Sequence, residues 1–178
     1  MRYIAMAIVM ALTCLNLSTA QAVTDPFERD SLRGLPGVAV LIVSISPDAQ
    51  ADSLREHAVR RAVELTLRSS GIRVLTPSEI VKMKVIFIPW LRVSVTTAKN
   101  GPISIYAYNV SVEVLQDMSL AHRPQHMMLA PTWSTDVVGT IGKSNLRFVT
   151  SQIIEPLVKR FANDFLAVNP QHTRQLRK

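Results

Sequence analysis

The sequence predicts an α/β (α+β) fold, a two-layer sandwich in which a mixed sheet of about five strands carries two long helices on one face. Three observations predict it. Residues 38–45 form a nearly continuous apolar run, typical of a strand buried on both faces. Apolar residues recur at helical spacing over 54–65 and 146–165, and residues 85–138 largely follow a period of two. The predicted order is therefore β-α-β-(short α)-β-β-β-α.

The first 22 residues are typical of a signal peptide. Arg2 precedes an apolar run that ends at Leu17, and the small residues Ala20 and Ala22 fit cleavage after position 22. The run is shorter than the ~20 residues that span a bilayer, and no second run follows. We expect a periplasmic or secreted protein without a transmembrane segment after cleavage near Ala22. Retention of the segment as an uncleaved anchor is the alternative.

The rest of the chain is predicted to contain one domain. Of its 178 residues 48% are hydrophobic, which suits a single core, and we expect a polar N-terminal arm at 23–36, an α/β domain at 37–170 and a basic flexible tail at 171–178. The single cysteine, Cys14, lies in the predicted leader. The mature chain would then hold no disulfide, thiolate metal site or cysteine nucleophile.

The net charge of +7 is a poor indicator of partners. Loss of Arg2 lowers it by one, and three of the remaining positive charges lie in 171–178. No aromatic platform is interleaved with the basic residues, so we expect no nucleic acid partner.

Residues 38–75 are predicted to form a βαβ unit. Ser53 and Glu56 have the spacing of a capping box for the first long helix. Gly71 is placed to end that helix in the left-handed conformation, and 72–75 would form a strand parallel to the first. Four positions of this helix are expected to face the core: Leu54, Ala58, Ala62 and Leu65. Val59 and Val63 flank them.

A second capping box at 76–79, with proline at the first helical position, predicts a short helix to about Met83. An alternating strand follows, in which Pro89 indicates a bulge or an edge. Its core side would carry Val85, Phe87, Leu91, Val93 and Val95.

Residues 99–102, which include an Asn-Gly pair, predict a hairpin turn. The return strand alternates from Tyr106 to Met118, so one face would meet the core and the other water. A polar loop around 122–126 would lead to a third strand at about 128–138, ended by Gly139 and Gly142.

Ser144 is placed to cap the last long helix, in which Pro156 should produce a kink. Its expected buried stripe is Leu146, Val149, Ile153, Leu157, Phe161 and Phe165, with Ile154 and Val158 beside it.

The loop 118–128 is the candidate metal site. It contains His122, His126 and Met127, and imidazole and thioether groups are ligands that copper accepts. Pro124 and Arg123 argue against such a site. The alternative is a solvated loop whose methionines return to the core.

The water-facing side of the central hairpin is the candidate interaction surface. Its residues are Arg92, Ser94, Asn109, Ser111 and Glu113. We expect no cofactor and assign no catalytic residue, because the chain has no nucleophile elbow and no glycine-rich phosphate loop. A small hydrolase that uses residues such as Ser134 and Asp136 is the enzymatic alternative.

Two stretches, 68–76 and 161–170, together with the tyrosine-bearing hairpin, resemble a group of uncharacterised exported bacterial proteins. The element order also resembles the small α/β domains at the TolB N-terminus and in related envelope lipoproteins, in topology only. The resemblance implies an envelope interaction module. We therefore expect a non-enzymatic exported accessory protein that binds another envelope component, with an envelope protein or a second copy as partner. A hydrolase-like or copper-binding periplasmic protein is the alternative.

Overall fold

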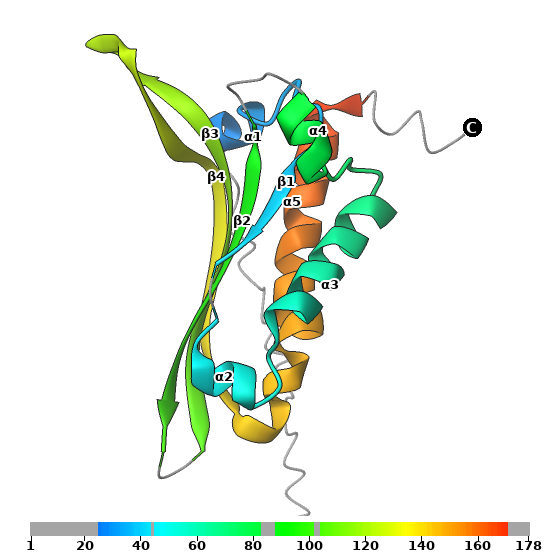
Figure 1. The fold of residues 1–178 in the computed structure, drawn as a ribbon, viewed down its shortest axis with the longest axis vertical. Coiled ribbons are helices and arrows are strands. Elements are labelled where there is room, and N and C mark those ends of the chain that lie inside the picture. Colours follow the sequence, from blue (N-terminus) through cyan, green and yellow to red (C-terminus); the bar gives the residue numbers. More distant parts are fainter. Residues whose placement is uncertain (1–24, 44, 83–87, 102–103, 171–178) are drawn as a thin grey trace, which may run out of the picture.

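The structure, a computed structural model, describes residues 25–43, 45–82, 88–101 and 104–170. In these residues four strands form one mixed sheet in the order β1-β2-β3-β4, and the two long helices α3 and α5 lie along one of its faces (Figure 1). The predicted α/β fold is confirmed, with four strands in place of five. The predicted leader at 1–22, the tail at 171–178, Val85 and Phe87 lie outside the described residues.

The strands differ in length and direction. β1 pairs with β2 in parallel, whereas β2 with β3 and β3 with β4 pair in antiparallel fashion. The strand bounds are β1 (Ala39–Ile42), β2 (Trp90–Asn100), β3 (Ile105–Leu120) and β4 (Arg123–Gly142).

The predicted strand at 72–75 is reduced to a single parallel bridge between Val38 and Val74. The Val38 amide donates to the Arg73 carbonyl, and the Leu75 amide donates to the Val38 carbonyl. The chain therefore runs in the predicted direction. It cannot extend the ladder because α4 begins at Pro77.

In the part of the chain that the structure describes, seven helical segments connect and cover the sheet. They are α1 (Pro26–Asp30), α2 (Pro47–Ala51), α3 (Glu56–Ser69), α4 (Pro77–Lys82), the 3₁₀ helix η1 (Lys143–Phe148), the π-helical turn η2 (Thr150–Ile154) and α5 (Glu155–Val168). No helix of the described residues is both long and apolar enough to cross a membrane.

The predicted start and core face of α3 are wrong. Ser53 has a φ of 87° in the turn after α2, so α3 starts later and its N-cap is Arg55, without a side-chain hydrogen bond. Val59 and Val63, expected beside the core stripe, are fully buried, whereas Leu65 is 65% exposed. Gly71, with a φ of 79°, follows the end of α3 in the left-handed conformation, as predicted.

The capping box at α4 is confirmed. The Thr76 amide donates to Glu79 Oε2 at 2.8 Å, and the Glu79 amide donates to Thr76 Oγ1 at 3.3 Å. The hydrogen bond from Arg73, followed by those from Thr76, lowers the pKa of Glu79 to about 2.

The last helix begins later than predicted. Gly142, not Ser144, precedes η1, and a π-helical turn separates η1 from α5. Pro156 lies in the first turn of α5, directly after the π-helical turn. Most of the predicted stripe is buried, including Phe161 and Phe165, whereas Ile153 and Leu157 are only partly buried.

The described part of the predicted N-terminal arm is folded onto the domain. Leu32 is fully buried in the core. The side chain of Asn169, just after α5, accepts from the Gly34 amide at 2.7 Å and donates to the Leu32 carbonyl at 2.8 Å. These bonds fasten the segment after α1 to the end of α5.

Candidate functional site: the hairpin extension

The predicted loop at 118–128 consists mainly of strand. β3 and β4 remain paired as far as Leu120 and Arg123, but β2 accompanies β3 only as far as Leu115. We call residues 116–130 the hairpin extension; they form a two-stranded projection that leaves the body of the sheet (Figure 1). The prediction that β4 begins near Met128 is wrong, because β4 begins at Arg123. Its first residues pair with β3 outside the core, so their sequence shows no alternation of apolar and polar residues that would indicate a strand.

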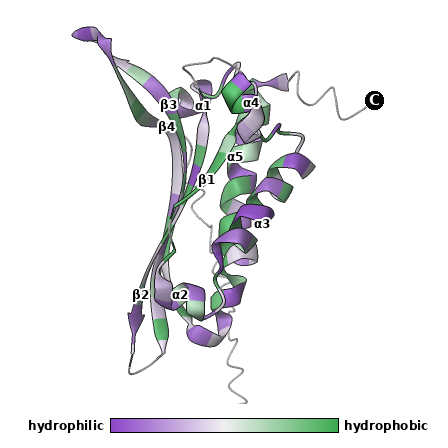
Figure 2. Ribbon diagram, in the orientation of Figure 1, coloured by the Kyte–Doolittle hydropathy of each residue, from purple (hydrophilic) through white to green (hydrophobic). Residues whose placement is uncertain are grey.

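The extension exposes large apolar side chains. Their exposed fractions lie between 36% and 51%, and the residues are Met118, Leu120, Met127, Met128 and Leu129. The expectation that these methionines return to the core is therefore wrong. Figure 2 shows hydrophobic stretches on the extension below a hydrophilic tip. Large apolar side chains gathered outside the core of a folded domain are typical of a contact surface.

A β-bulge forms the base of the extension. Val114 pairs with Trp133 and Leu115 pairs with Pro131, so Thr132 is an extra residue on β4. The Thr132 carbonyl accepts from the Ser31 hydroxyl at 3.1 Å, and Gln116 Nε2 donates to Thr132 Oγ1 at 2.6 Å. Gln116 also donates to the Ser31 carbonyl at 3.0 Å. The direction of the extension is thus held by the residue that ends α1.

The candidate copper ligands all lie on the extension. Met127 pairs with Ser119, and the next pair is Leu120 with Arg123, so His126 lies in an unpaired segment and His122 in the turn. Among the described residues, no group of three or more His, Cys, Asp or Glu is arranged to hold a metal ion. Copper binding stays a prediction.

The candidate interaction residues of the central hairpin do lie together. They alternate with buried core residues on β2 and β3, so they share the sheet face opposite α3 and α5 (Figure 1). Arg92 pairs with Glu113, and Ser94 lies opposite Ser111. Asn109 is exposed on the same face, opposite Thr96. These five side chains are polar, and Arg92 and Glu113 among them form an ion pair.

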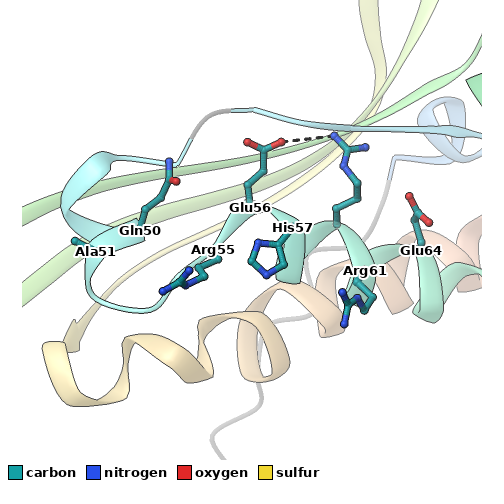
Figure 3. Close-up of a pocket in the computed structure, with 8 residues that line it drawn as sticks. Gln50, Ala51, Arg55, Glu56, His57, Arg61 and Glu64 are labelled. Atoms are coloured by element: carbon teal, nitrogen blue, oxygen red, sulfur yellow. Dashed lines mark ion pairs between the residues drawn. The ribbon is translucent and has the colours of Figure 1, made fainter.

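An open depression of about 760 Å³ lies along the outer side of α3 (Figure 3). Arg55, His57 and Arg61 give it a basic character, offset by Glu56 and Glu64. Arg60 crosses to β1 and donates to the Val40 carbonyl at 2.9 Å, while its other terminal nitrogen lies 3.6 Å from Glu56. Arg60 therefore covers the edge of β1, and its guanidinium is engaged there.

A polar cluster around Asp52 was missed from the sequence. Its carboxylate accepts from the Tyr106 hydroxyl at 2.6 Å, from Lys143 at 2.9 Å and from Lys99 at 3.0 Å. The Tyr106 hydrogen bond, followed by those of the two lysines, holds the pKa of Asp52 well below its usual range. Burial raises the pKa of Tyr106, and Asp52 raises that of Lys99. The cluster connects the loop between α2 and α3 to β2, β3 and η1. No local sequence pattern predicts it.

Fold and site together define a two-layer α/β domain that presents an apolar hairpin extension. No family model matches the chain, and no curated protein matches it. Among solved structures, a PelC dodecamer from Paraburkholderia phytofirmans is similar at 18% identity, with 71% of this chain and 87% of that chain covered and a TM-score of 0.40.

Proposed function

We propose that this chain is a non-enzymatic exported accessory module that binds another component of the cell envelope through the hairpin extension. The observation that carries the proposal is the set of five exposed apolar side chains on a projection outside the core. Leaving such groups in water costs solubility and promotes aggregation unless a partner covers them. The bulge at Thr132 supports the proposal because it fixes the direction in which the extension is presented.

The extension is a better contact surface than the two surfaces that the sequence favoured. The candidate residues on the open face of the sheet are polar and include the Arg92–Glu113 pair, which would lose solvation on binding. The outer edge of β1 is four residues long, and Arg60 already occupies its Val40 carbonyl.

The experiment removes apolar surface from the extension without touching the core. The full-length chain is expressed in a Gram-negative bacterium, and its distribution between the soluble periplasm and the envelope pellet is compared with that of a Met127→Ser/Met128→Ser variant. The matched control is Leu65→Ser/Val81→Ser, which removes two exposed apolar side chains from α3 and α4.

Wild type and control should be retained in the envelope pellet, and the methionine variant should become soluble. Thermal unfolding of all three proteins checks that each is folded. Equal retention of the methionine variant and wild type would refute the proposal. The mass of the purified product also tests cleavage after Ala22.

A further inference from the structure

We propose that the envelope component bound by the hairpin extension is an anionic lipid surface, with the extension lying in the headgroup layer. This inference rests on the proposed function and names the chemistry of the partner. Three features of the extension support it: its charge, the distribution of its apolar side chains over both faces, and its unpaired backbone edges.

The tip of the extension carries its basic residues, whereas Asp117 lies near its base. Residues 118–129 contain Arg123, His122 and His126 and no Asp or Glu. Arg123 is exposed, and no ion pair joins it to another described residue. A lysine or arginine close to an anionic membrane contributes about 1 kcal/mol to binding.

The apolar side chains lie on both faces of the extension. Met118 and Met128 are directly opposite each other and share one face. Met127 lies opposite Ser119 and Leu129 opposite Asp117, on the other face. A protein that docks against one face would leave the other apolar face in water. A fluid lipid layer can surround both faces without a shaped groove, and flexible methionine side chains adapt to it.

The backbone limits the depth of insertion. Beyond Leu115 the described chain has only two strands, so among the described residues each strand of the extension has one edge without a ladder partner. Unpaired amides and carbonyls cannot enter hydrocarbon, whereas they remain hydrated among headgroups. At that depth the methionines reach the acyl boundary and the basic tip reaches lipid phosphates, as in other interfacial segments.

The test is co-sedimentation of the purified protein with vesicles. Phosphatidylcholine vesicles are compared with vesicles of phosphatidylcholine and phosphatidylglycerol in a 3:1 ratio, at 0.05 and 0.5 M NaCl. Wild type should bind the anionic vesicles at least tenfold more tightly than the neutral ones at low salt, and high salt should reduce that binding severalfold. Met127→Ser/Met128→Ser should lose about tenfold, and Arg123→Gln about fivefold. The control Leu65→Ser/Val81→Ser should bind as wild type does.

A second measurement reports the location of the tip. An environment-sensitive dye on Gln125→Cys, in a Cys14→Ser background, should shift to shorter wavelength with anionic vesicles, and the same dye on Ser78→Cys in α4 should not. The lipid inference is wrong if the wild-type protein does not bind anionic vesicles, or if the methionine variant binds them as tightly as wild type does. If envelope retention still depends on Met127 and Met128 in that case, the partner is a protein and the proposed function stands. If retention is also independent of them, the proposed function fails as well.

Discussion

The packing of α3 makes a sharp prediction, because Leu65, which spacing assigns to the core stripe, is exposed, whereas Val63, expected beside that stripe, is buried. Val63 is fully buried in the core between α3 and the sheet, and Leu65 is 65% exposed. Val63→Ala removes two buried methyl groups, about 0.8 kcal/mol each in transfer free energy. A residual cavity destabilises the folded protein by about 1 kcal/mol more, and the better helix propensity of alanine offsets about 0.6 kcal/mol. The free energy of unfolding should therefore fall by about 2 kcal/mol.

Leu65→Ala should change the free energy of unfolding by less than about 0.5 kcal/mol, because the side chain is mostly in water. Urea unfolding followed by far-ultraviolet circular dichroism measures both variants. For a chain of this size, Val63→Ala should lower Tm by about 4–8 °C and Leu65→Ala by less than about 2 °C. Equal losses, or a larger loss for Leu65→Ala, would show that α3 presents the other face and would refute the described packing.

Three further predictions concern local features. Thr76→Ala should cost α4 about 1 kcal/mol of local stability and speed amide exchange at 78–82, with little effect on global unfolding because α4 buries no residue; unchanged exchange would contradict the capping box. Gly139→Ala should cost about 1–2 kcal/mol, because its Cβ would lie 2.5 Å from the Tyr108 hydroxyl, and the cost should shrink in a Tyr108→Ala background; additive losses in this double-mutant cycle would exclude the contact. Asp52→Asn should destabilise the protein at neutral pH. Because the folded pKa of Asp52 lies below its ordinary 3.8, the difference from wild type in urea midpoint should shrink as the pH falls below 3.8, and a pH-independent difference would argue against the charged cluster.

Periodicity predicted the elements of the domain where one face of an element meets the core. The alternation through Val110 and Val112 identified the inward side of β3, and both residues are fully buried. The same alternation failed at Met118, which is 46% exposed because it lies on the hairpin extension, outside the core that the described residues form.

Other errors arose from contacts that spacing does not encode. Ser53 matches a capping box, but its positive φ belongs to the turn after α2, and α3 begins later, at Glu56. The Asp52 cluster gathers groups from four separate elements, so it could be found only after folding brought them together.

The extra residue at Thr132 has an evolutionary consequence. It reverses the alternation of β4, so that Pro131 and Trp133 face opposite sides of the hairpin although only one residue separates them. Trp133 keeps its place in the core, with its indole donating to Asp164 at 3.1 Å, whatever length or composition the distal hairpin acquires. Matched insertions or deletions in the two distal strands would therefore leave the core register intact. The hairpin extension is an exchangeable segment, which selection can lengthen, shorten or rewrite without repacking the domain that carries it.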